Sequence, residues 1–124
     1  MDKRVLIIED EADIREAMAE ALVQANIETL TAANGEQGLQ VAVNEKPDLI
    51  LLDIVMPKMD GHAVLNRLRQ DPWGRGVKVI MLTSMDDVKN IGEAHKNSIT
   101  DYIIKAHSSL DDIVNKVRLS LFTD

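Results

Sequence analysis

Side chains able to do chemistry follow four short aliphatic runs of this chain. They are Glu9 and Asp10 after residues 5–8, Asp53 after residues 49–52, Thr83 after residues 79–82, and Lys105 after residues 102–104. Runs of this length are typical of buried parallel strands, whose carboxyl ends lie along one edge of a sheet. We therefore expect three carboxylates, a hydroxyl and an ammonium to meet at that edge, where open α/β sheets bind ligands.

This combination of groups favours phosphoryl transfer. Three carboxylates in one crevice repel one another unless a cation joins them, and ligation by oxygen atoms alone favours Mg²⁺. A metal ion, an ammonium and a hydroxyl around one carboxylate supply the positioning and charge neutralisation that a phosphoryl group requires. Asp53 is the best candidate nucleophile, because it lies on the most central strand and nearest to Thr83 and Lys105. One acidic strand end alone would indicate only a polar loop.

Strand-like and helix-like stretches alternate five times along the chain. The predicted strands cover residues 5–8, 28–33, 48–53, 78–83 and 102–104, and the predicted helices cover about 12–26, 35–46, 61–71, 86–96 and 109–121. The second helix is expected to begin at Asn34-Gly35 with Leu39, Ala42 and Val43 on its inner face. The last helix has a capping box in Ser109 and Asp112.

The alternation predicts an α/β fold, a doubly wound five-stranded parallel sheet with helices on both faces. The first and third strands are the most apolar and should be central neighbours, which gives the flavodoxin-like strand order 2-1-3-4-5. Glu9, Asp10 and Asp53 then lie at the switch point of the sheet. The 124 residues are expected to form one domain, residues 1–124.

Composition argues against several classes of function. The net charge of −7 and the scattered Lys and Arg argue against nucleic-acid binding by this chain alone. The sequence has no cysteine, which excludes a disulfide framework or a thiolate metal site. No apolar stretch approaches the ~20 residues of a membrane span, and the start of the chain does not form a signal sequence. We therefore expect a cytoplasmic protein that does not enter a membrane.

Five groups of residues, in order along the chain, resemble the receiver domain of two-component response regulators. They are Glu9-Asp10, residues 51–57 (LLDIVMP), Asp60-Gly61, Thr83-Ser84 and residues 101–105 (DYIIK). The resemblance extends over the whole chain. It implies that Asp53 accepts a phosphoryl group from a histidine kinase or a histidine phosphotransfer protein. It also implies a protein that is not an enzyme in its own right, although it contributes to its own phosphorylation and dephosphorylation.

The resemblance assigns roles to the remaining positions. Asp10, Asp53 and the Val55 carbonyl would bind Mg²⁺, with Glu9 acting through water. Thr83 would donate a hydrogen bond to the phosphoryl oxygens and Lys105 would form an ion pair with them. Tyr102 matches the aromatic residue that turns inward when the threonine moves.

The resemblance also implies partners. A downstream protein target would bind the face formed by the helix at 86–96, the strand at 102–104 and the last helix. The chain would be a monomer or a phosphorylation-dependent dimer.

Two places depart from the family pattern, and one of them is the segment before the fifth strand, where Asn97, Ser98 and Thr100 are more polar than the usual glycine and alanine. The other is the position after the lysine. The family usually has proline after the lysine, with a cis peptide bond, whereas this chain has Ala106. A cis bond before a residue other than proline costs about 3 kcal/mol, so the geometry of this loop stays open.

Three other functions remain as alternatives. A Mg²⁺-dependent aspartyl-phosphate phosphatase would require an Asp-x-Asp nucleophile at the end of the first strand. A flavin protein would require a phosphate loop there, where this chain has Glu9-Asp10-Glu11. A pseudo-receiver would bind partners without phosphorylation, and the intact Asp53, Thr83 and Lys105 argue against it.

The tryptophan and the three histidines are predicted to lie outside the chemistry. Trp73 follows a turn proline and should pack at the end of the sheet opposite Asp53. His62, like the other two histidines, is expected to be solvated on a helix or loop surface.

Overall fold

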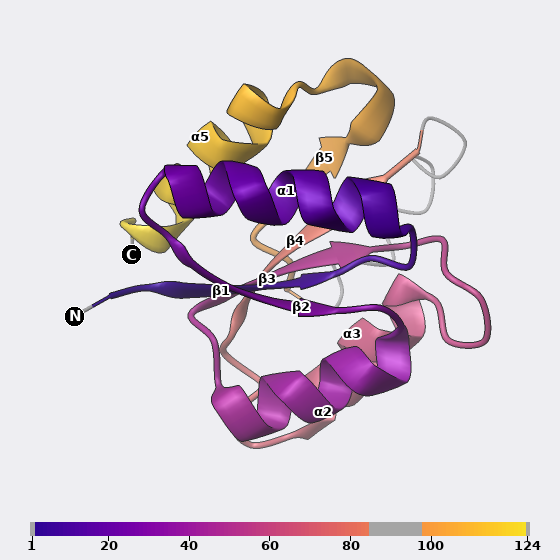
Figure 1. Ribbon diagram of the computed structural model, residues 1–124. Helices are drawn as coiled ribbons and strands as arrows, with labels where there is room; N and C mark the ends of the chain where they lie inside the picture. The colour runs from indigo at the N-terminus through magenta and orange to yellow at the C-terminus, as the bar shows by residue number, and fades with distance from the viewer. Residues whose placement is uncertain (1, 85–97, 124) are drawn as a thin grey trace.

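The computed structural model describes residues 2–84 and 98–123 (Figure 1). In order, the elements are β1 (Arg4–Ile8), α1 (Ala12–Gln24), β2 (Glu28–Ala32), α2 (Gly35–Glu45), β3 (Leu49–Asp53), α3 (Gly61–Gln70), β4 (Lys78–Thr83), β5 (Asp101–Ile104), a 3-10 turn (Lys105–His107) and α5 (Leu110–Leu121). The boundaries agree with the sequence prediction to within one or two residues. The helix predicted at residues 86–96 lies outside the described residues.

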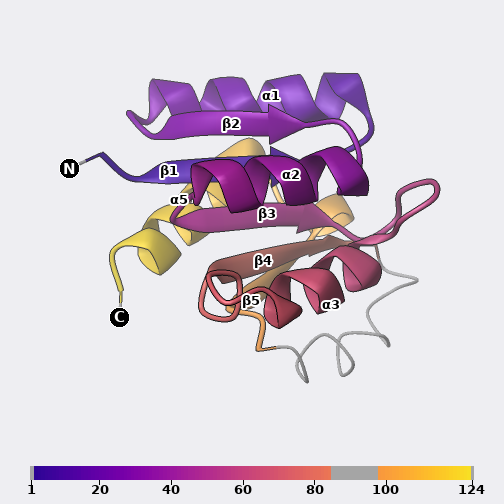
Figure 2. The ribbon, with the colours of Figure 1, turned by 90° about the horizontal axis from the view of Figure 1, so that it is seen from below.

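The five strands form one parallel sheet in the order β2-β1-β3-β4-β5, as predicted. Helices α1 and α5 cover one face of this sheet and α2 and α3 cover the other (Figures 1 and 2). The chain reverses its direction of winding between β1 and β3, which are hydrogen-bonded neighbours. The crevice beyond their carboxyl ends is therefore the switch point of the sheet.

The core forms two apolar layers separated by the sheet. Alternate residues of each strand point to opposite faces, so Leu6 and Ile8 pack toward α2 and α3 while Val5 and Ile7 pack toward α1 and α5. Every residue of β3 is buried, including Asp53. This central strand therefore holds its terminal carboxylate on a rigid support.

Helix α2 packs on the sheet through smaller residues than predicted. Gly35, Gly38 and Ala42 are its buried residues, whereas Val43 is 39% exposed and does not belong to the inner face. A Cβ at position 38 would lie 2.4 Å from Cδ1 of Ile8, so this glycine lets the helix approach β1 closely. The prediction for Val43 was wrong because glycine was not counted as part of the packing stripe.

Side-chain caps begin three of the four described helices. Asn34 accepts a hydrogen bond from the Gln37 amide at the start of α2, and Asp60 accepts one from the Ala63 amide at the start of α3. The capping box predicted for Ser109 and Asp112 is confirmed. Helix α1 has no side-chain cap at Glu11. None of the helices in residues 2–84 and 98–123 is long and apolar enough to cross a membrane.

Candidate functional site

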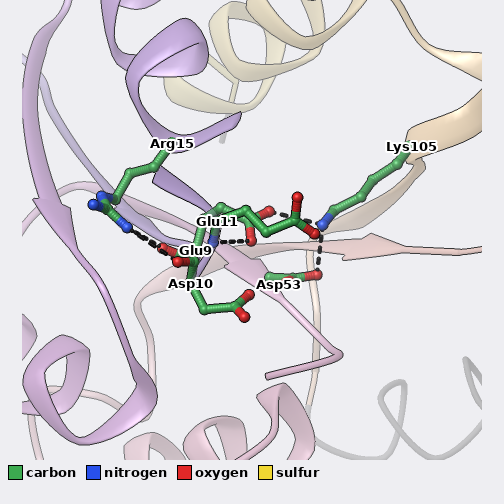
Figure 3. Close-up of polar contacts among 6 residues, drawn as sticks. All are labelled: Glu9, Asp10, Glu11, Arg15, Asp53 and Lys105. Carbon is green, nitrogen blue, oxygen red and sulfur yellow. Dashed lines mark hydrogen bonds and ion pairs between the residues drawn. The ribbon is translucent and has the colours of Figure 1, made fainter. Parts of the chain in front are cut away.

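The carboxyl ends of β1 and β3 bring three carboxylates together, as the sequence predicted. Glu9, Asp10 and Asp53 can each place one oxygen within 4.8 Å of the others (Figure 3). Glu9 is fully buried and Asp53 is 3% exposed, whereas Asp10 is half-buried. Two of the three carboxylates are therefore buried and the third, that of Asp10, is more accessible. This arrangement suits a cation that enters from solvent.

Lys105 joins two of these carboxylates. Its Nζ lies 2.7 Å from Oε1 of Glu9 and 2.9 Å from Oδ1 of Asp53 (Figure 3). The lysine belongs to the 3-10 turn that directly follows β5, an edge strand two places from β3. Its long side chain thus spans from the edge of the sheet to the switch point.

One ammonium shared by two buried carboxylates leaves them in different electrostatic states. Burial raises the pKa of Asp53 to about 7, although Lys105 opposes this rise. Burial also opposes ionisation of Glu9, but hydrogen bonds from Lys105 and the Glu11 amide outweigh it and lower the pKa of Glu9. Lys105 is half-buried, which disfavours its charge, yet its two carboxylate partners raise its pKa. The pKa shifts therefore favour the ionised form of Glu9 over that of Asp53, and a further cation would favour ionisation of Asp53.

Thr83 lies at the end of β4, one residue beyond the register partner of Asp53. Its side chain is 1% exposed and its Oγ1 donates a hydrogen bond of 3.1 Å to the Ser84 carbonyl oxygen. Within the described part of the chain this is the one hydrogen bond of the hydroxyl, so its rotation would break no interaction with a distant described element.

Val55 and Tyr102, the remaining predicted positions, lie on a loop and on an edge strand. Val55 is 62% exposed in the loop after β3. Tyr102 is half-buried on β5 and packs against the core layer beneath α2 and α3. The structure places Tyr102 on the same strand that leads to Lys105. No peptide bond among the described residues is cis, so the Lys105-Ala106 bond is trans.

Gly61, which the sequence shows only as part of the Asp60-Gly61 pair, supports the end of β3. Its amide donates a 2.8 Å hydrogen bond to the Ile54 carbonyl oxygen. A Cβ here would lie 2.4 Å from the carbonyl oxygen of Asp53 and 2.8 Å from Cα of Ile54. Glycine therefore allows α3 to begin directly against the end of β3, which fixes the backbone of Asp53.

Arg15 was also missed. Its Nη1 lies 2.9 Å from the Glu9 carbonyl oxygen and 3.5 Å from the Asp10 carbonyl oxygen (Figure 3). The available signal was its place in the first turn of α1, where the helix dipole favours acidic rather than basic residues.

The reading of His62 as a solvated side chain was wrong. Its Nε2 is buried and has no hydrogen-bond partner among residues 2–84 and 98–123. His62 is the second residue of α3 and is half-buried as a whole. Trp73 is half-buried and lines a hollow with Lys46, Asp48 and Lys78, residues that flank the amino ends of the strands, so its predicted position at the opposite end of the sheet is confirmed.

A family model supports the resemblance seen in the sequence. The model described as "Response regulator receiver domain" matches residues 5–118, which is nearly the whole chain. The matched segment begins within β1 and ends within α5, so it contains all of the residues placed at the site.

Individual relatives and solved structures agree with this match. The phosphate regulon transcriptional regulatory protein PhoB of Pseudomonas aeruginosa is 41% identical over 106 residues, which are 86% of this chain and 46% of that protein. The probable transcriptional regulator ycf27 of Guillardia theta is 37% identical over 86% of this chain and 41% of its own length. The chain thus spans less than half the length of these curated relatives. The receiver domain of Francisella response regulator 1452 superposes with a TM-score of 0.87 at 27% identity, covering 97% of both chains.

Proposed function

Because this chain belongs to the response regulator receiver domain family, we propose that it is a switch controlled by phosphorylation of Asp53. Receiver domains of response regulators interact with histidine kinases and with downstream effectors in two-component signalling. The observation that carries the assignment to Asp53 is its position: a nearly buried carboxylate at the switch point, held between Lys105 and the acidic pair. A histidine kinase or a histidine phosphotransfer protein would supply the phosphoryl group.

The donor set fits Mg²⁺. Three carboxylates face a single ammonium, so the site carries an excess of negative charge that a divalent cation would balance. Asp10, Asp53 and the Val55 carbonyl would hold the ion, and Glu9 would act through a water molecule. When bound, Mg²⁺ would supply charge neutralisation for the phosphoryl oxygens and favour the ionised form of Asp53.

The chain's own residues would then carry out the transfer. The Asp53 carboxylate attacks phosphorus in line with the donor, so a new oxygen–phosphorus bond forms as the phosphorus–nitrogen bond of the phosphohistidine breaks. Lys105 exchanges its contact with Asp53 for an ion pair with a phosphoryl oxygen. Thr83 turns its hydroxyl from the Ser84 carbonyl toward another phosphoryl oxygen.

The phosphorylated state would alter partner binding rather than catalyse turnover of a substrate. Movement of Thr83 would leave space that Tyr102 can enter, which would change the surface formed by β5 and α5. The downstream protein would bind there, together with the segment predicted to be a helix at 86–96, which lies outside the described residues. We place this switch in the cytoplasm as a monomer or a phosphorylation-dependent dimer.

Mass spectrometry of the intact protein tests the assignment. Incubation with acetyl phosphate and Mg²⁺ should add one phosphoryl group to the wild type and none to Asp53→Asn. Asp48→Asn is the matched control, because Asp48 directly precedes β3 and so lies at the opposite end of this strand from Asp53. Addition to Asp53→Asn would overturn the assignment, and a folded wild type that never gains mass would favour the pseudo-receiver. Steady release of phosphate from p-nitrophenyl phosphate would favour the phosphatase.

A further inference from the structure

We propose that Arg15 is a positioning residue that fixes the backbone of the acidic pair Glu9-Asp10 so that both carboxylates are held ready for a divalent cation. This inference rests on the proposed function of the same site. Two donor contacts carry it, from the Arg15 guanidinium to the carbonyl oxygens of Glu9 at 2.9 Å and Asp10 at 3.5 Å. Figure 3 shows the guanidinium reaching back from α1 to the backbone behind the two carboxylates.

The turn between β1 and α1 is tied by side chains of its own neighbours. Oε2 of Glu9 accepts a 3.1 Å hydrogen bond from the Glu11 amide, and the Glu9 carbonyl accepts the bond from Arg15. The Glu9 amide also donates to the Ala32 carbonyl oxygen at 3.1 Å, which ties the residue to β2. Asp10 lies between these fixed points. Its carboxylate is therefore placed by a backbone that is held on both sides.

The position of Arg15 in the helix supports a role beyond ordinary packing. A positive side chain in the first turn opposes the partial positive charge of the helix amino terminus, so a helix gains nothing from it locally. Helix α1 is also the described helix that lacks a side-chain cap. The arginine links the helix start to the strand end instead, and its Nη1, which carries two hydrogens, donates to both carbonyl groups.

Charge and positioning predict opposite effects on cation binding, which makes the inference testable. As a nearby positive charge, Arg15 would weaken Mg²⁺ binding, so its removal should strengthen binding. As a positioning residue, it keeps the turn ordered before the cation binds, so its removal should weaken Mg²⁺ binding. We expect positioning to dominate, because the guanidinium contacts the backbone of Glu9 and Asp10, two of the three carboxylate residues that meet at the site.

The experiment is calorimetric titration of the whole chain with MgCl₂ at constant ionic strength. Arg15→Gln should bind Mg²⁺ roughly fivefold or more weakly than the wild type, and Arg15→Lys should lie between them, because lysine keeps a charged donor but on a flexible stem without the planar guanidinium. Arg118→Gln is the matched control, since Arg118 also donates to a backbone carbonyl, that of Ala25, at 3.2 Å, far from the site. It should bind Mg²⁺ as the wild type does.

Two further measurements separate positioning from loss of structure. Thermal unfolding in EDTA should show a similar loss of stability for Arg15→Gln and Arg118→Gln. At saturating Mg²⁺, Arg15→Gln should be phosphorylated by acetyl phosphate at close to the wild-type rate. Equal or tighter Mg²⁺ binding by Arg15→Gln would overturn the inference. Should that variant not fold, wild-type affinity in Arg15→Lys would overturn it. A wild type that binds Mg²⁺ without being phosphorylated would contradict the proposed function and leave the Arg15 result readable.

Discussion

The two ends of the sheet use charged residues in different ways. At the amino end, Lys78 donates to the carbonyl oxygens of Ser120 and Thr123 and so ties the last turn of α5 to the start of β4. Also at that end, the Asp48 carboxylate accepts a 2.8 Å hydrogen bond from the Arg4 amide. At the carboxyl end, by contrast, three carboxylates meet, and the Lys105 ammonium pairs with two of them, Glu9 and Asp53.

The contrast distinguishes charges that stabilise the fold from charges that prepare a reaction. At the amino end, the charged groups of Asp48 and Lys78 are already hydrogen-bonded to backbone groups, so a ligand is not needed to balance them. The surplus of negative charge at the carboxyl end has a cost in the absence of a cation, and the chain retains it. Substitutions at the two ends should therefore differ in what they change.

The largest difference is expected from two glycines. At Gly61, at the carboxyl end, an added Cβ would lie 2.4 Å from the Asp53 carbonyl oxygen. At Gly76, which precedes β4 at the amino end, an added Cβ would have no atom within 4 Å among the described residues. Gly61→Ala should lower the free energy of unfolding by about 3 kcal/mol, and Gly76→Ala should change it by less than about 0.5 kcal/mol. Urea denaturation measures both.

A second readout follows from the same pair. Because the clash at position 61 displaces the backbone of Asp53, phosphorylation of folded Gly61→Ala at saturating Mg²⁺ should slow by about tenfold or more. Equal stability and equal phosphorylation of the two alanine variants would show that the close approach of α3 to β3 has no role in the site.

The next effect is a pH dependence that only the carboxyl end should show. The pKa of Asp53 is raised from 3.8 to about 7 by burial, so the folded chain keeps a proton that the unfolded chain releases. The resulting stabilisation is fully present below pH 3.8 and is lost as the pH rises through 7. In EDTA, Asp53→Asn should gain on the order of 2 kcal/mol over the wild type between pH 5 and pH 8, because asparagine cannot ionise.

The pKa shifts of Glu9 and Lys105 move their titrations away from that window. The pKa of Glu9 is lowered from 4.5, so the stability it contributes is present above that value and is lost only as the pH falls below it. The pKa of Lys105 is raised from 10.5, so its contribution is lost only above that value. Gly76→Ala is the control, with an offset from the wild type that does not vary with pH. A constant offset for Asp53→Asn as well would contradict the raised pKa.

Much of the site could be predicted from the sequence, because its residues follow strands whose order is set by apolar content. The position of each group at a strand end fixes the neighbours of Asp53 once β1 and β3 are known to be central. The supporting contacts could not be predicted. Arg15 donates to carbonyl groups and Gly61 acts through the side chain that it lacks, and neither interaction leaves a periodic pattern of residue types.

A smaller effect should distinguish the acidic residues at the two ends of the sheet by how much each contributes to Mg²⁺ binding. Asp10→Asn removes a proposed ligand and should weaken Mg²⁺ binding by about tenfold, equivalent to ~1.4 kcal/mol, with a parallel loss of phosphorylation at low Mg²⁺. Glu9→Gln should weaken it less, since Glu9 is expected to act through water. Asp48→Asn at the amino end should leave the calorimetric titration unchanged. Equal losses from Asp10→Asn and Glu9→Gln would refute this order.

The smallest effect is expected in the fluorescence of Trp73, the one tryptophan of the chain. Its ring packs on the core layer beneath α2 and α3, near the amino ends of the strands, whereas the carboxylates lie at the other ends. The two regions lie at opposite ends of β3, whose residues are all buried. Mg²⁺ or a phosphate mimic such as beryllofluoride should therefore bind with little change in Trp73 emission, even at concentrations that saturate the calorimetric titration. Strong quenching that Asp10→Asn abolishes would show that events at the site reach the amino end, and the two ends could no longer be treated as independent.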